Sequence, residues 1–373
     1  MHDLTIDRVQ TRLLDVPLVR PHRFARTGMA AQPVMLLTLT TAGGVTGTGE
    51  GVVPGGPWWG GESVETMQVI VERYLVPVLL GRRVDDIAGL QRDMDDVVGG
   101  NLFAKTAVEV ALHDAWARSL DVPVHTLLGG LARTSVPVTW ALGTESAGEV
   151  VDEAQAKLSS GAHTTFKLKM GAAEPAADVT RIVEVTEKLR DSAGVRVDLN
   201  ARWDLATSLR WLPALADAGV ELVEQPVPAG EVDWLRQISA ALRVPVMADE
   251  SLRTPSDAYR LARADAAGVF SVKTTKSGGL RRSAEITAIA AAAGVPCHAG
   301  TSIESPVGTA ASLHLACAAP GMTWGSELFG PLLMTEQLTV EPLRYADGHL
   351  HLPEGPGLGV ELDPDVVERL TRR

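Results

Sequence analysis

Titratable side chains recur at regular intervals in the second half of this 373-residue chain, each at the end of a short apolar run. Neighbouring members of the series are 24 to 29 residues apart. This spacing is typical of repeated βα units, and the carboxyl ends of the strands of a barrel meet at one mouth. We therefore predict one shared site for Lys169, Asp198, Glu224, Asp249, Lys273, His298 and Glu327.

Three members of this series are carboxylates at the ends of consecutive predicted strands, namely Asp198, Glu224 and Asp249. Three carboxylates held together without a counter-charge repel one another and partly take up protons. An all-oxygen set with room for water and substrate suits Mg²⁺, or Mn²⁺ as a substitute. Zinc is disfavoured because no set of histidines and cysteines converges with them. The alternative is a salt-bridge network to the lysines of nearby strands.

Lysines supply the candidate acid and base. Lys167 and Lys169 are two residues apart in a predicted strand, so both amines point to the barrel lumen. A lysine close to other cations shifts toward the neutral amine, which makes it a usable acid or base near neutral pH. Lys273 ends a strand across the barrel, so Lys169 and Lys273 are predicted to flank a substrate on opposite faces. Lys276 is expected in the following loop.

The elements that must position these residues change character along the chain. Strand-like segments at 4–16 and 34–52 precede helical periodicity over 64–80, 84–98 and 103–119, which indicates an α+β module. Eight apolar runs then alternate with helical stretches, which favours a barrel over a doubly wound sheet because the glycine-rich nucleotide fingerprint is missing. These runs are 136–141, 165–170, 195–200, 221–226, 244–249, 269–273, 295–299 and 322–328. Two strand-like pieces follow in the tail, at 350–352 and 359–362.

Composition excludes several classes of protein. Hydrophobic residues make up 45% of the chain and charged residues 21%, as in ordinary globular proteins. The net charge of −12, without any run of lysine and arginine, argues against a nucleic-acid or anionic-membrane partner. Two cysteines exclude a disulfide framework, and neither a signal-peptide pattern nor an apolar stretch long enough to cross a bilayer is found. A soluble, cytoplasmic protein is expected.

The strand-end motifs resemble the enolase superfamily, and within it the muconate lactonizing enzyme (muconate cycloisomerase) subgroup, over the whole chain. They are Lys167-x-Lys169, Asp198-x-Asn200, Glu224-Gln225-Pro226, Asp249-Glu250-Ser251 and Lys273-x-x-Lys276-x-Gly278-Gly279. The segments at 20–22, 324–331 and 356–359 are similar to muconate cycloisomerases in particular. The resemblance implies an α/β fold, a capped (β/α)₇β barrel of the TIM type. Its parts are an α+β capping domain (1–126), the barrel (127–340) and a C-terminal segment (341–373) that completes the cap.

The resemblance also implies an activity and a cofactor. The expected enzyme is an isomerase that interconverts cis,cis-muconate and muconolactone, in the degradation of aromatic compounds such as catechol and benzoate, with Mg²⁺ or Mn²⁺ on Asp198, Glu224 and Asp249. Lys169 is the first choice for the acid and base, and Lys273 is the alternative on the opposite face. Lys167 would hold charge near a carboxylate of the dicarboxylate substrate. A homo-oligomer, an octamer in the family, is expected.

The implied substrate contacts are Glu327, Arg20, His22, Trp59, Pro54, Asn200 and His298. His298 departs from the cycloisomerases compared, which carry an uncharged residue there, so it is either a substrate contact or an ordinary strand-end histidine. Arg20 is either a clamp for the distal carboxylate or part of a surface salt bridge. The glycine-flanked Trp58-Trp59 pair is expected in a loop that closes over the site, with one ring reaching it.

Three alternatives to a muconate cycloisomerase stay open. A dipeptide epimerase (or N-acylamino-acid racemase) and an o-succinylbenzoate synthase would use the same barrel, metal and lysines. A barrel kept for binding without turnover is the third, and the presence of every expected metal ligand and both flanking lysines argues against it.

Overall fold

The computed structural model describes residues 3–23, 27–143 and 145–372. The chain begins with an antiparallel sheet in the order β1 (Ile6–Arg23), β2 (Gly28–Thr41) and β3 (Thr46–Gly51). Helices follow and cover this sheet, as the change from strand to helix periodicity predicts. They are α1 (Pro57–Gly60), α2 (Val64–Ile70), the π-helical turn η1 (Val71–Leu75), α3 (Val76–Leu79), α4 (Ile87–Val97), α5 (Leu102–Ser119) and α6 (Val124–Leu127).

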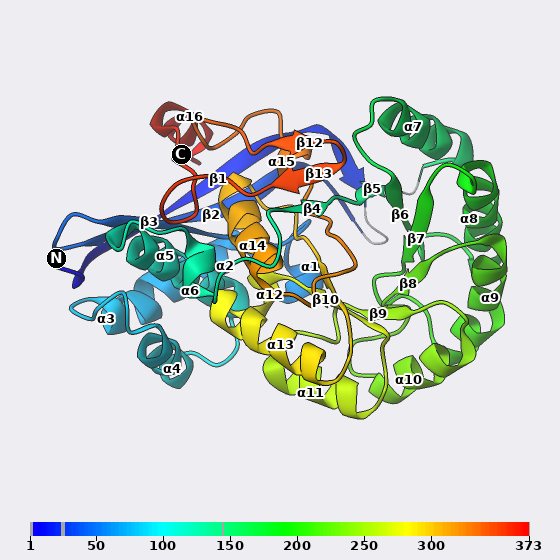
Figure 1. The fold of residues 1–373 in the computed structure, drawn as a ribbon, viewed down its shortest axis with the longest axis horizontal. Helices are drawn as coiled ribbons and strands as arrows, with labels where there is room; N and C mark the ends of the chain where they lie inside the picture. Colours follow the sequence, from blue (N-terminus) through cyan, green and yellow to red (C-terminus); the bar gives the residue numbers. More distant parts are fainter. Residues whose placement is uncertain (1–2, 24–26, 144, 373) are drawn as a thin grey trace.

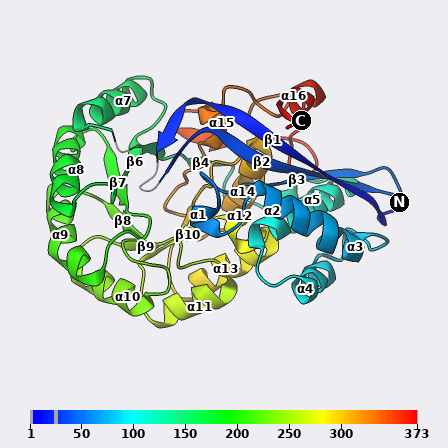
Figure 2. The same cartoon turned by 180° about the vertical axis from the view of Figure 1, so that it is seen from behind.

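The second part of the chain is a curled sheet of seven parallel strands in the order β11-β10-β9-β8-β7-β6-β5. The strands are β5 (Trp140–Leu142), β6 (Thr165–Lys169), β7 (Gly194–Asp198), β8 (Leu222–Glu224), β9 (Val246–Ala248), β10 (Val269–Val272) and β11 (Cys297–Ala299). The helices that follow the strands are α7 (Ala147–Ser159), α8 (Pro175–Leu189), α9 (Leu205–Ala218), α10 (Val232–Ala241), α11 (Pro255–Arg263), α12 (Thr274–Ser277), α13 (Leu280–Ala292) and α14 (Pro306–Ala318). Figures 1 and 2 show α7 to α11 on the outside of the curve.

The sheet closes through a single residue instead of an eighth strand. Ser326 forms isolated parallel bridges with Val138 beside β5 and with Ala299 of β11. Its neighbour Gly325 has a left-handed φ of 70°, which interrupts the extended backbone that the run at 322–328 predicts. The first predicted run, 136–141, is likewise split between β4 (Ser135–Pro137) and β5. The predicted barrel with an N-terminal cap is nevertheless confirmed.

The C-terminal segment returns to both parts of the molecule. It contains α15 (Gly330–Leu333), the hairpin β12 (Tyr345–Ala346) and β13 (His349–His351), and α16 (Pro364–Leu370). β13 pairs with β4 at the foot of the barrel, whereas Thr371, next to α16, forms a bridge with Leu14 of β1 (Figure 1). The strand predicted at 359–362 is absent among the described residues, where Leu362 makes only one bridge, to Thr339. The domain boundaries stay predictions.

Two buried carboxylates of the cap bind the first turns of barrel helices. Glu50 of β3 accepts hydrogen bonds from the backbone N–H groups of Ser305 (2.9 Å) and Gly308 (3.0 Å) at α14. Glu109 of α5 accepts from the first two N–H groups of α13, at 2.7 and 2.8 Å. Backbone N–H groups in the first turn of a helix have no partner within the helix, so these carboxylates satisfy them across the interface. Among the described helices, none is long and apolar enough to cross a membrane.

Candidate active site

The strand register places the charged strand ends side by side. Lys169 of β6 pairs with Asp198 of β7, which pairs with Glu224 of β8. Asp249 follows β9, and Lys273 follows β10. All five side chains are buried. Since residues in register on neighbouring parallel strands point to the same face, these side chains share the upper part of the barrel lumen.

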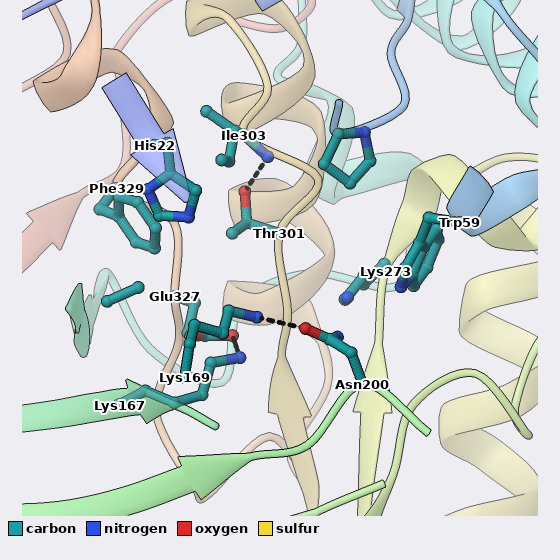
Figure 3. A pocket seen from close by; sticks show the side chains of 12 residues that line it. His22, Trp59, Lys167, Lys169, Asn200, Lys273, Thr301, Ile303, Glu327 and Phe329 are labelled. Carbon is teal, nitrogen blue, oxygen red and sulfur yellow. Dashed lines mark hydrogen bonds and ion pairs between the residues drawn. The ribbon is translucent and has the colours of Figure 1, made fainter. Parts of the chain in front are cut away.

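A pocket opens at this end of the barrel, with a free volume of about 30 Å³. Figure 3 shows Lys167, Lys169 and Asn200 at its floor, Trp59 and Lys273 on one side, and His22 and Phe329 on the other. Its lining consists of His22, Pro54, Trp59, Ala141, Lys167, Lys169, Asn200, Lys273, Thr301, Ile303, Glu327 and Phe329. Eight of the thirteen expected site residues therefore line one cavity, and the three expected metal ligands lie behind its lysines.

Ion pairs connect the lysines of β6 to the carboxylates. The ammonium of Lys167 lies 2.8 Å from Glu224, 2.5 Å from Glu327 and 3.4 Å from Asp198. The ammonium of Lys169 lies 2.5 Å from Asp198 and donates to the Asn200 side-chain oxygen at 3.2 Å. Both ammoniums therefore sit between the pocket and the carboxylate layer.

A second group of charges surrounds Asp249. Lys273 binds one carboxylate oxygen at 2.6 Å, and Lys276 binds the other at 2.5 Å. Lys273 also lies 4.5 Å from the centre of the Trp59 ring, a cation–π distance. Lys276 lies in α12 and is fully buried, so its charge serves Asp249 and not an anion in an exposed loop. The expected loop position of Lys276 is wrong because the chain turns directly into a helix after β10.

The carboxylates raise the pKa of two lysines, each of which has a direct anionic partner. Burial disfavours the ammonium of Lys167, but attraction to Glu224, Glu327 and Asp198 outweighs it and raises its pKa well above the ordinary value. Attraction to Asp249 likewise overcomes burial and raises the pKa of Lys273. These carboxylates therefore hold Lys167 and Lys273 as ammoniums. The shift of a lysine toward the neutral amine beside a bound metal stays a prediction.

The three candidate metal ligands are strongly coupled. Burial and repulsion by Asp198 raise the pKa of Glu224 well above its ordinary value, despite Lys167. Lys273 and Lys276 overcome burial and lower the pKa of Asp249. One oxygen of Glu224 has no hydrogen-bond partner among the described residues, although it is buried. Within the same residues no three His, Cys, Asp or Glu side chains form a ready metal cage, because the lysines now neutralise these carboxylates.

The capping segment reaches the pocket through Trp59. Its indole N–H donates to Glu250 at 3.0 Å, and Glu250 also accepts from the Asn200 amide at 3.2 Å. Trp58 instead packs against both hydrophobic cores of the molecule. One ring of the pair therefore lines the pocket and is tied by hydrogen bonds to the end of β9, while the other supports the cap.

Two expected substrate contacts point elsewhere. Arg20 forms an ion pair with Glu153 of α7 at 2.9 Å and does not line the pocket, because that carboxylate lies within its reach. Arg20 therefore forms the salt bridge in this structure, and its role as a substrate clamp stays a prediction. His298 also lies outside the lining, since its Nδ1 bonds to the carbonyl of Trp324 at 3.0 Å, below the pocket.

Four lining residues were not foreseen as site residues: Ala141, Thr301, Ile303 and Phe329. Ile303 has a left-handed φ of 62°, unusual for a β-branched residue, and its N–H donates to the Thr301 hydroxyl at 2.8 Å. Ile303 follows the seventh predicted strand, 295–299, and loops that follow barrel strands form the active-site face. This position was the sequence signal that could have indicated a site residue. Nothing in the sequence pattern separates Thr301 and Ile303 from other loop residues.

Comparison with known proteins decides the family. The model for the mandelate racemase / muconate lactonizing enzyme N-terminal domain matches residues 8–129, and the enolase C-terminal domain-like model matches residues 149–366. The chain belongs to the mandelate racemase/muconate lactonizing enzyme family. Muconate cycloisomerase 1 of Rhodococcus opacus is 61% identical over 372 residues and is covered, like this chain, over 100% of its length. The family resemblance of the motifs is therefore confirmed.

Solved structures of the family agree with this fold. The crystal structure of muconate lactonizing enzyme from Pseudomonas fluorescens complexed with muconolactone has a TM-score of 0.97 and 38% identity, with 100% of both chains covered. That of 2-chloromuconate cycloisomerase from Rhodococcus opacus 1CP has a TM-score of 0.96 and 44% identity, covering 99% of this chain and 100% of the other.

Proposed function

We propose that the chain is a muconate cycloisomerase, an isomerase that interconverts cis,cis-muconate and muconolactone. One observation carries the proposal: Lys167, Lys169 and Lys273 border a single small pocket that also has aromatic walls. Such a pocket suits a flat dianion, because ammoniums bind carboxylates and apolar rings exclude water. The full-length identity of 61% to a muconate cycloisomerase supports the same reaction.

The proposal includes a divalent cation, Mg²⁺ or Mn²⁺, held by Asp198, Glu224 and Asp249. Their all-oxygen chemistry suits these ions, and the buried Glu224 oxygen without a partner provides a free lone pair for one. The mutual repulsion that raises the pKa of Glu224 is relieved by a cation. When bound, the cation would supply positive charge that stabilises a substrate carboxylate as it gains negative charge.

The residues of this chain account for the proton in the reaction. One carboxylate of muconate adds to the distant double bond and forms the lactone C–O bond, and the electron pair moves toward the other carboxylate as an enolate. Lys169 then gives one proton to the α-carbon and recovers it from solvent, so that the dianion becomes a monoanionic lactone. Lys167, 2.5 Å from Glu327, would hold the charged carboxylate. Lys273 remains the alternative donor on the opposite face.

The pocket must widen to take this substrate. Its free volume of about 30 Å³ is small for a six-carbon dicarboxylate. Trp59 and Pro54 belong to the cap segment between β3 and α2, and the lysines are flexible. Substrate entry therefore requires a shift of this segment or of the lysine side chains.

The test is direct. The purified protein with Mg²⁺ or Mn²⁺ is mixed with cis,cis-muconate, and loss of the diene absorption in the ultraviolet is followed. Rapid loss is expected, together with the appearance of muconolactone, and a chelator should stop it. Lack of any loss, alongside epimerisation of dipeptides, would favour the dipeptide epimerase instead. A parallel assay with a chloromuconate compares the substrate named for the muconate cycloisomerases with the one named for the chloromuconate cycloisomerase. Light scattering tests the expected homo-oligomer.

A further inference from the structure

A column of buried polar side chains continues below the pocket, along the axis of the barrel. Lys167 contacts Glu327, Glu327 lies next to His298, and His298 contacts Arg196. The Glu327 carboxylate is 3.8 Å from His298 Nε2, and His298 Nδ1 is 3.5 Å from Arg196 Nη1. Glu327 and His298 are each 1% exposed, whereas Arg196 is 9% exposed and lines a second pocket together with Thr139 and Trp324.

The hydrogen bond of His298 fixes which ring nitrogen carries the proton. Its Nδ1 lies 3.0 Å from the Trp324 carbonyl oxygen, which can only accept, and 3.5 Å from Arg196 Nη1, which can only donate. The shorter of these two contacts places the proton on Nδ1. A neutral imidazole has one N–H, so Nε2 then presents its lone pair to Glu327. Consistent with this, His298 Nε2 and one oxygen of Glu327 are buried without a hydrogen-bond partner among the described residues. The lone pair repels the carboxylate and leaves it to Lys167.

Arg196 keeps the imidazole in that state. It donates to the Trp324 carbonyl at 3.1 Å and to the Thr139 hydroxyl at 3.3 Å, which anchors the guanidinium at the seam of the barrel. No carboxylate of the described residues forms an ion pair with it, and the acidic groups that attract it from a distance are Glu221, Glu327 and Glu224. Burial and this neighbouring charge both lower the pKa of His298, while Glu327 opposes them.

We propose that His298 and Arg196 are positioning residues: Arg196 keeps His298 uncharged, and the uncharged ring leaves Glu327 bound to Lys167. A charged imidazole would compete with Lys167 for the carboxylate and weaken one of the three carboxylate contacts that hold the lysine at the pocket floor. The inference rests on the proposed function for its kinetic consequence, because Lys167 is there the residue that holds the substrate carboxylate. Its structural part, the charge of His298, does not depend on the substrate.

The kinetic test is a double-mutant cycle. Arg196→Met removes the charge at similar size, and His298→Asn keeps a donor for the Trp324 carbonyl but cannot take up a proton. Alone, Arg196→Met should lower kcat about 10-fold to 100-fold, with a smaller change in KM, as for lost supporting contacts at other active sites. In the His298→Asn background the same change should cost less than about 2-fold. Equal costs in both backgrounds would overturn the proposal.

Two further variants keep the test informative if Arg196→Met folds poorly. Arg196→Lys preserves the charge without the guanidinium bonds and should restore most of kcat. His314→Asn is the matched control, because His314 is also a buried histidine bonded to a carbonyl, that of Leu358, at 3.1 Å on α14. This control should change stability but not kcat. Loss of kcat in Arg196→Lys equal to that in Arg196→Met would refute the role of charge.

A spectroscopic readout separates this inference from the proposed function. Solid-state ¹⁵N spectra of histidine-labelled resting protein should show His298 as neutral with its proton on Nδ1, assigned by the signal that His298→Asn removes. In Arg196→Met the same residue should become the imidazolium. A charged His298 in the unmodified protein would overturn the inference whatever the substrate, whereas failure to consume muconate would overturn only the proposed function.

Discussion

Glu50→Gln tests how the cap is held on the barrel. Glu50 is buried between β3 and α14, where it accepts hydrogen bonds from two backbone N–H groups and from the Ser305 hydroxyl. Burial raises its pKa to about 7, although these hydrogen bonds favour the charged form, and nearby Glu304 adds to the rise. Glutamine has the size of the protonated acid and cannot titrate. Its amide nitrogen cannot accept the hydrogen bonds that one Glu50 oxygen accepts, so the variant carries a loss of stability that does not depend on pH, and the proton contributes the part that does.

The sign and the size follow from the two pKa values. Glu50 binds its proton more tightly in the folded state than at the ordinary value of 4.5. The resulting stability is complete below pH 4.5 and is lost as the pH rises through about 7. At about 1.4 kcal/mol per pKa unit, the difference corresponds to an upper limit of about 3 kcal/mol.

Urea unfolding of both proteins between about pH 5 and about pH 8 measures this difference. From the acidic to the basic end, the difference between the two free energies of unfolding should shift in favour of Glu50→Gln by up to about 3 kcal/mol. Glu187→Gln, on the exposed surface of α8, controls for the loss of one negative charge. A difference that stays constant with pH would refute the reasoning.

Three further predictions concern the site. Lys169→Ala should slow exchange of the α-proton of muconolactone in D₂O by about 10²-fold or more, and exchange at the normal rate would assign the proton to Lys273. Asp249→Asn should weaken Mn²⁺ binding, measured by electron paramagnetic resonance, by at least about 10-fold, and full activity in a chelator would contradict the metal assignment. Arg20→Ala breaks a partly exposed pair, so it should cost less than about 1 kcal/mol of stability and leave KM unchanged; a large rise in KM would restore the substrate clamp.

Features that follow from local pattern could be predicted from the sequence. The βα repeat fixes which residues end the strands, and parallel pairing then brings Lys169, Asp198 and Glu224 together. The helices of the cap, at 64–79, 87–97 and 102–119, follow from their apolar periodicity within a few residues. The π-helical turn η1 gives no such signal, because it changes the hydrogen bonding without changing the apolar pattern.

Partner choice between distant side chains could not be predicted. Arg20 pairs with Glu153, which is far along the sequence, and the orientation of His298 depends on the carbonyl of Trp324. The predicted eighth strand does not form, because Gly325 has a left-handed backbone. That the two bridges of Ser326 are enough to close the sheet can be learned only from the surrounding fold. The residues at the strand ends can thus be predicted from the sequence, whereas the contacts that orient their side chains cannot.

The carboxylates that cross from cap to barrel limit how this chain can be recombined. Without the cap, α13 and α14 would begin with backbone N–H groups that have lost Glu109 and Glu50 as acceptors. A chimaera that joins the cap of one relative to the barrel of another therefore needs acceptors at both positions. The two parts of the chain that the family models match thus share buried hydrogen bonds, which an exchange of either part must preserve.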